Sequence, residues 1–146
     1  MTIRAESILA AAVTKVTGLA TTGTRVDRGR GDDIPSELMP CLRVAMGDDL
    51  SLTPYLPSLV DSTMELFVTA HAHDTATNIE TLLNQMRGEV VVALLADRTL
   101  GLSYVHGIFE LGASRPELTG DLTKPAGRME LKFEVRYRRS ASDPAS

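Results

Sequence analysis

Residues 128–138 carry the clearest pattern of apolar and polar positions in the chain. Every second residue there is apolar, and each residue between is charged. Successive side chains of a strand point to opposite faces, so the alternation predicts a strand with one apolar and one charged face. The apolar face holds Met129, Leu131, Phe133, Val135 and Tyr137, and the charged face holds Arg128, Glu130, Lys132, Glu134, Arg136 and Arg138.

Residues 74–97 repeat apolar side chains at helical spacing instead. The stripe consists of Ile79, Leu82, Leu83, Met86, Val90, Ala93 and Leu94. Asp74 is the expected N-cap, because a carboxylate can accept from the free amides of a first helical turn. Such a helix would be about 35 Å long, close to the roughly 36 Å of the final strand. We therefore expect the helix to lie along the apolar face of that strand.

Weaker patterns predict the remaining elements. The expected helix covers residues 2–17, and the expected strands cover residues 24–28, 40–46, 61–73 and 104–111. Residues 47–60 contain Pro54 and Pro57, which argue against regular structure there. The same segment is unusually apolar for a loop, so it either folds back on the core or awaits a partner.

This order of elements predicts an α+β fold. Strands without intervening helices favour a mixed or antiparallel sheet, of about four to five strands, with the N-terminal helix and the long helix packed on one face. Its 146 residues suggest one domain, which we place at residues 1–139. The small, polar residues 140–146 are expected to form a disordered tail.

Composition excludes several classes of protein. The net charge of −4 disfavours general nucleic-acid binding, which needs clustered Lys and Arg. The first residues do not resemble a signal peptide, and no apolar run is long enough for a membrane helix, so we expect a soluble protein without a membrane partner. Cys41 is the single cysteine, which fits a reducing compartment. It is expected to be a buried apolar side chain, because a nucleophile would need a histidine nearby.

Candidate chemistry is sparse. His71 and His73 share a strand face, but two ligands do not make a zinc site. Residues 28–33 lack the ending of a phosphate-binding loop, and Asp48 and Asp49 stand in a sequence typical of turns. A Gly-x-Ser-x-Gly nucleophile motif is absent from the sequence. We therefore predict a protein that is not an enzyme, without catalytic residues, metal or cofactor; the alternative is a small metal-dependent hydrolase that uses the two histidines.

The charged face of residues 128–138 has two interpretations. It could be a solvated outer face that discourages aggregation, or a subunit contact in which charge pairs set the register. The predicted subunit or tail-tube interface residues are Leu52, Tyr55, Leu56, Glu130, Lys132 and Glu134.

The layout resembles the tail terminator (tail completion) proteins of long-tailed bacteriophages. The resemblance covers residues 2–139 and includes the segments PCLRV at 40–44 and GRMELKFEVRY at 127–137. It implies a virion protein of the tail–neck junction, assembled in the host cytoplasm as a ring, commonly a hexamer. The ring would cap the tail tube, end tube polymerisation and present a head–tail joining surface.

The partners that the resemblance implies are further copies of the chain, the major tail tube protein and the head-completion or neck protein. Phage DNA would pass through the lumen without specific binding. Another head–tail connector or a tail tube protein is the alternative within the same class.

Overall fold

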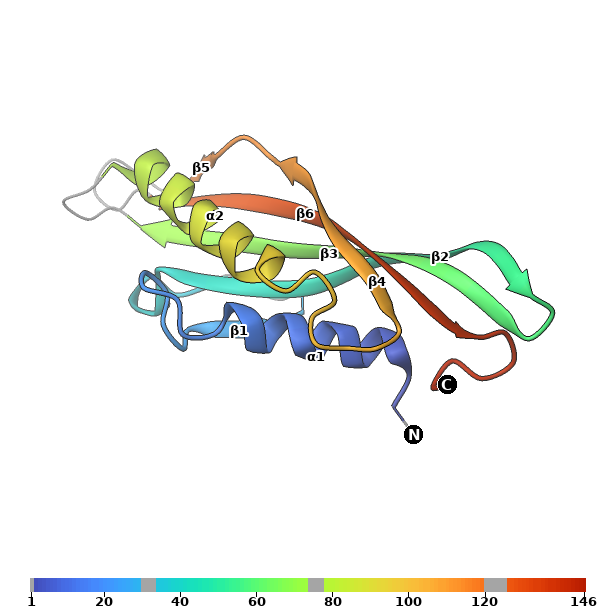
Figure 1. Ribbon diagram of the computed structural model, residues 1–146. Helices are drawn as coiled ribbons and strands as arrows, with labels where there is room; N and C mark the ends of the chain where they lie inside the picture. Colours follow the sequence, from blue (N-terminus) through green and yellow to red (C-terminus); the bar gives the residue numbers. More distant parts are fainter. Residues whose placement is uncertain (1, 30–33, 74–77, 120–125) are drawn as a thin grey trace.

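The computed structural model describes residues 2–29, 34–73, 78–119 and 126–146, without the side chains of residues 36, 51–53, 55, 56 and 119. Two α-helices and six strands follow one another along these described residues (Figure 1). They are α1 (Arg4–Val16), β1 (Val26–Arg28), a 3₁₀ turn (Ser36–Leu38), β2 (Cys41–Leu56), β3 (Leu59–His73), α2 (Ile79–Leu95), β4 (Val105–Ala113), β5 (Glu117–Thr119) and β6 (Ala126–Ser140).

The strands form one mixed sheet in the order β1-β2-β3-β6-β4. β1 runs parallel to β2, and the other pairs are antiparallel. The sheet has six strands rather than four to five, because β5 pairs with β6 beyond the end of β4, in a segment for which the sequence predicted no strand. The predicted α+β class is confirmed.

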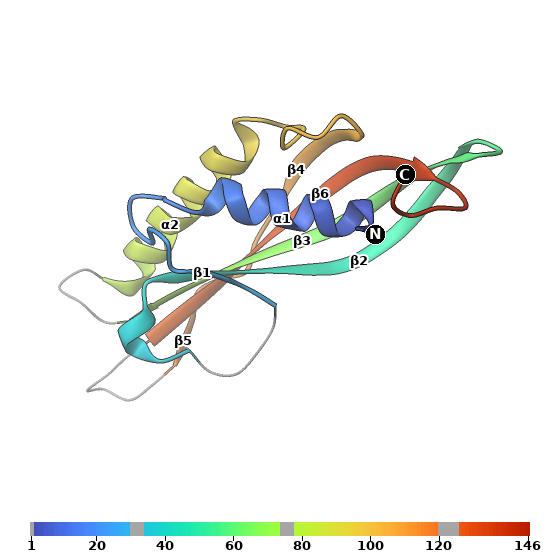
Figure 2. The same cartoon turned by 90° about the horizontal axis from the view of Figure 1, so that it is seen from below.

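Both helices cover the same face of the sheet (Figures 1 and 2). The alternation of β3 and β6 sends one set of apolar side chains toward the helices. No α-helix of the described residues covers the opposite face, which we call the helix-free face. The buried core includes Ile8, Val16, Leu42, Met64, Leu66, Leu83, Met86, Leu94, Leu131 and Phe133.

The helix α2 is shorter than the sequence predicts. It begins at Ile79, and its N-cap is Asn78, whose side chain accepts from the amides of Glu80 and Thr81. Asp74, the expected cap, lies outside the described residues. With 17 residues, α2 spans about 26 Å, whereas the 15 residues of β6 span about 50 Å. The expected match in length is therefore wrong, and the strands extend beyond α2.

The prediction that residues 47–60 lack regular structure is also wrong. They continue β2 and β3 into a hairpin that projects beyond both helices (Figure 1), and we call this hairpin the arm. β2 changes register at three points along the arm. Within the described strands β1 pairs only with Leu42–Val44, so Pro54 lies in an edge stretch of β2, where a missing N–H is tolerated. Pro57 occupies the turn, since Leu56 pairs with Leu59.

The two ends of the chain lie side by side (Figure 1). The Arg4 amide donates to the carbonyl of Pro144 across 2.9 Å, and the Ala141 amide donates to Ser58 across 2.9 Å. Residues 140–146 thus contact the body in this structure; their disorder in solution stays a prediction, which limited proteolysis would test. Within the described ranges, neither helix is long and apolar enough to cross a bilayer.

Candidate assembly surface

The helix-free face of the sheet contains three of the predicted interface residues. Glu130, Lys132 and Glu134 alternate with buried residues along β6 and lie on this face. On β3 they are paired in register with Thr69, Phe67 and Glu65. The alternation in the sequence thus identified the face correctly, and it brings the charged residues of two adjacent strands together.

These charges pair within the chain. Lys132 Nζ lies 3.4 Å from Glu65 Oε1, and Arg136 lies 3.0 Å from Glu134 Oε2. Both ion pairs are partly exposed. Each therefore adds only between a few tenths of a kcal/mol and about 1 kcal/mol to the free energy of unfolding. Glu130 has no ion pair within the described part of the chain. A partner binding here would have to compete with Lys132–Glu65 and Arg136–Glu134, so the role of these residues in an interface stays a prediction.

Two aromatic rings lie beneath the charged layer. Lys132 Nζ is 5.7 Å from the centroid of the Phe67 ring, and the Arg136 guanidinium is 4.9 Å from that of Phe109. Gly47 lies so close to Phe67 that a Cβ there would come within 2.4 Å of the ring. The face therefore combines apolar rings with paired charges, a composition suited to contact with protein.

Hydrogen bonds from Tyr137 and Arg138 of β6 attach the base of the arm to the rest of the chain, and we call this place the root of the arm. The Tyr137 hydroxyl, in a residue only 1% exposed, donates to Asp49 Oδ2 across 2.6 Å. Burial, and secondly the Asp49 carboxylate, raise the pKa of Tyr137, so the hydroxyl keeps its proton. Beside it, Arg138 Nε donates to Asp61 Oδ1 across 2.8 Å, and His106 Nε2 lies 3.3 Å from the same oxygen.

The other predicted interface residues, Leu52, Tyr55 and Leu56, belong to the arm. Their backbone continues β2, but their side chains lie outside the described residues. The side chain of Leu50, two residues before Leu52 in the same strand, is described and is 61% exposed. Asp48 and Asp49 lie in β2, where the ladder is irregular between Met46 and Asp49, and not in the turn that their neighbours suggested.

Cys41 lies opposite His71, a neighbour that sequence reasoning could not find because the two are thirty residues apart. Burial raises the pKa of the Cys41 thiol, and Asp27 raises it further. Burial also lowers the pKa of His71, followed by the charges of Arg43 and Arg128. The thiol is therefore protonated at neutral pH, which is the inert state rather than the nucleophilic one.

The described residues supply no further metal ligands beside the histidines. Among the described residues, no group of three or more His, Cys, Asp or Glu side chains could hold a metal ion. The loop at residues 28–33 is described only up to Gly29, and Arg28 pairs with Glu6 on α1.

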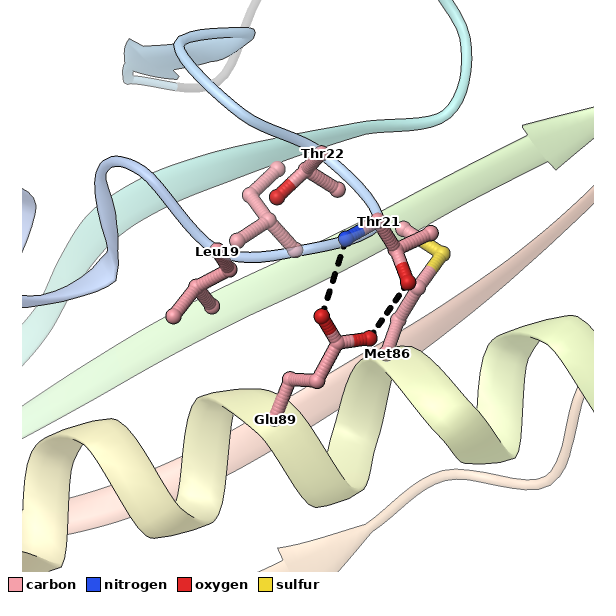
Figure 3. Close-up of a pocket in the computed structure, with 6 residues that line it drawn as sticks. Leu19, Thr21, Thr22, Met86 and Glu89 are labelled. Carbon is pink, nitrogen blue, oxygen red and sulfur yellow. Dashed lines mark hydrogen bonds between the residues drawn. The ribbon is translucent and has the colours of Figure 1, made fainter.

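A shallow depression lies where the segment after α1 meets α2 (Figure 3). Its lining includes Leu19, Leu42 and Met86. Glu89 of α2 accepts from the Thr21 amide across 2.9 Å and also from the Thr21 hydroxyl. The carboxylate is thus used to tie the segment to the helix, which is a structural role.

Comparison with known proteins shows the fold. No protein-family model matches the chain, and no curated protein matches it. Among solved structures, it is similar to a chain of a particle titled "Virion of native gene transfer agent (GTA) particle". The TM-score is 0.51 with 17% sequence identity, and the match covers 93% of this chain and 88% of the other. Identity at this level shows a shared fold.

Proposed function

We propose that this chain is a structural protein of a phage-like virion, and specifically a tail terminator. The observation that carries the proposal is the fold, which it shares over 93% of its length with a chain of a gene transfer agent virion. The resemblance of its sequence layout to tail terminators points to the same class. A non-enzymatic role agrees with side chains that serve structure, such as the protonated Cys41 and the tethering Glu89.

In this proposal the chain forms a ring, commonly of six copies, on the last ring of the tail tube. The arm and the helix-free face supply contacts to neighbouring copies and to the tube, through Leu52, Tyr55 and Leu56 and through Glu130, Lys132 and Glu134. The remaining surface meets the head-completion or neck protein, and DNA passes through the lumen. The ring ends tube polymerisation at the tail–neck junction.

Deletion of the gene that encodes this chain, followed by electron microscopy of the particles that form, tests the proposal. Electron microscopy is expected to show tails of uncontrolled length that are not joined to heads, and the wild-type gene supplied in trans should restore both. Tails of normal length attached to heads would contradict the proposal.

Two other outcomes distinguish the related classes. Normal-length tails without heads would favour a different connector. Polymerisation of the purified chain into long tubes would favour a tail tube protein.

A further inference from the structure

We propose that the arm of one copy docks on the β4–β5 edge of the next copy, so that copies join head to tail. The inference rests on the proposed ring and specifies the contact that builds it. The β4–β5 edge is defined here by β4, β5 and the residues between them, which together flank β6.

Exposed apolar side chains occur at both surfaces. Leu50 on the arm is 61% exposed. On the β4–β5 edge, Leu111 is 52% exposed and Leu118 is 67% exposed. Figure 1 shows the tip of the arm and β5 at opposite ends of the molecule. One copy therefore cannot cover its own edge with its own arm, whereas a second copy can.

Each surface carries one exposed charge without a described partner, and the two charges have opposite signs. The arm carries Asp48 and Asp49 and neither Lys nor Arg. Asp49 accepts from Tyr137, whereas Asp48 is exposed and its carboxylate has no partner in the described part of the chain. A negative charge is thus available on the arm.

The edge contains two acidic residues and one arginine, and both acidic residues are paired within the chain. Glu110 is already paired with Arg87 at 2.8 Å, and Glu117 with Arg128 at 2.8 Å. Arg115, between β4 and β5, is exposed and pairs with no described residue. Asp48 and Arg115 are therefore the charges that a head-to-tail contact would bring together, and such pairs orient partners more than they add affinity.

In the proposed contact, side chains meet between the two copies. The arm does not add a hydrogen-bonded strand to the sheet of the next copy. β4 changes register at two points along its pairing with β6, and the arm stretch of β2 changes register three times and contains Pro54. Bulges and prolines at sheet edges prevent regular strand addition. The arm can nevertheless dock at low entropic cost, because Tyr137 and Arg138 hold its root in place.

The two surfaces differ, so the contact is heterologous. Repetition of a heterologous contact generates a closed ring if the rotation closes and a filament if it does not. A contact of this kind is what a ring of identical subunits requires.

Charge reversal tests the contact in assembled particles. Asp48→Arg and Arg115→Asp are each expected to reduce particles with joined tails at least about tenfold, which corresponds to about 1.4 kcal/mol. The double variant, in which the signs are exchanged, should return to within about threefold of wild type. Arg98→Asp, a reversal at another exposed arginine, is the matched control and should assemble normally.

Cross-linking gives a second measurement that does not depend on tail length. A chain with Leu50→Cys and Leu118→Cys, oxidised in the particle, should form a ladder of covalent oligomers that ends at the ring size. Each single variant should give no ladder, and Cys41 should not interfere because it is buried.

The outcomes separate the contact from the function. Single reversals that assemble like wild type, together with no ladder, would overturn the contact even if the gene deletion gives long tails. A ladder of cross-linked oligomers, in particles whose tails keep their normal length when the gene is deleted, would support the contact and refute the terminator role.

Discussion

Tyr137 links the core to the arm through a single hydroxyl. Its ring is buried among core residues, and its hydroxyl donates to Asp49. Tyr137→Phe should keep the packing and remove the bond, lowering the free energy of unfolding by about 1 kcal/mol. The loss is modest because Asp49 is exposed and water can solvate its carboxylate. Urea denaturation measures it.

Tyr104→Phe is the matched control for that variant. Arg4 stacks on the Tyr104 ring at 4.3 Å, a contact that phenylalanine keeps. We expect a change below about 0.5 kcal/mol. An equal loss in both variants would show that the Tyr137 hydroxyl has no special role.

Asp61 makes stability depend on pH at acid values. Hydrogen bonding to Arg138, and then to His106, lowers the pKa of Asp61 below its ordinary value. A carboxyl group whose pKa is lowered in the folded state stabilises the fold above its unfolded pKa, of about 3.9. That contribution is lost as pH falls through the folded pKa.

The Asp61→Asn variant should therefore be less stable than wild type at pH 7. As the pH falls from about 5 to 3, its free energy of unfolding should decrease less than that of wild type. Thermal unfolding over this range measures both. Asp48→Asn, at an exposed carboxylate without a described partner, is the matched control and should change the free energy of unfolding at pH 7 by less than about 0.5 kcal/mol. Parallel profiles for wild type and Asp61→Asn would contradict the assignment.

At the scale of elements, α2 contacts β6 closely at Gly127. A Cβ at this position would lie 2.6 Å from Ile79 Cγ2 and 3.3 Å from Leu83 Cδ1. The first turn of α2 would have to move, so Gly127→Ala should destabilise the protein by about 1–3 kcal/mol. Chemical denaturation measures the change.

Gly88→Ala is the opposite case on the same helix. Apart from its chain neighbours and the backbone of its own helix, a Cβ at Gly88 would meet no described atom within 4 Å, and alanine favours a helix by about 0.5–1 kcal/mol over glycine. This variant should be more stable than wild type. The same sign of change in both variants would contradict the close packing of α2 on β6.

The alternation around Phe133 and the stripe through Met86 were enough to predict β6, α2 and the face that each buries. Local patterns carry this information because burial follows the period of the element. The start of α2 was wrong because Asp74 and Asn78 are both suitable cap residues, and only the packed structure selects between them.

The arm could not be predicted, because the effect of a proline depends on strand position. Pro54 would break a central strand, but it is tolerated at an edge, and edges are set by the whole sheet. The candidate assembly surface, too, could be predicted only in part, because part of it depends on the whole sheet. Glu130, Lys132 and Glu134 were placed on one face by alternation, whereas the pairing of Lys132 with Glu65 depends on the register of β6 against β3.

At the scale of the whole molecule, assembly and stability should be separable. Replacing residues 54–60 by Asn-Gly would close the hairpin between Thr53 and Asp61, which are partners in register. The core and the Tyr137–Asp49 and Arg138–Asp61 contacts are retained. We expect a melting temperature within about 4 °C of wild type and loss of ring assembly, measured by calorimetry and by electron microscopy of particles.

Particles that assemble normally with the shortened hairpin would show that the tip of the arm, which includes Tyr55 and Leu56, is not a subunit contact; Leu50 and Asp48 stay in place in this variant. A large fall in melting temperature would instead show that the arm is part of the folding unit. Arg98→Asp, which leaves the hairpin intact, controls for the handling of variant particles.

The hydrogen bond between Arg4 and Pro144 brings the first helix and the last residues within 2.9 Å. The two termini are therefore close together, and a linker of a few residues could join them. New ends opened beside Arg98, which is exposed, would leave both layers of the fold in place. A circular permutant of this kind would move a fused label from the start of α1, beside Arg4, to the neighbourhood of Asp97, which pairs with Lys15 near the end of α1, so that the orientation of the subunit in a particle could be mapped.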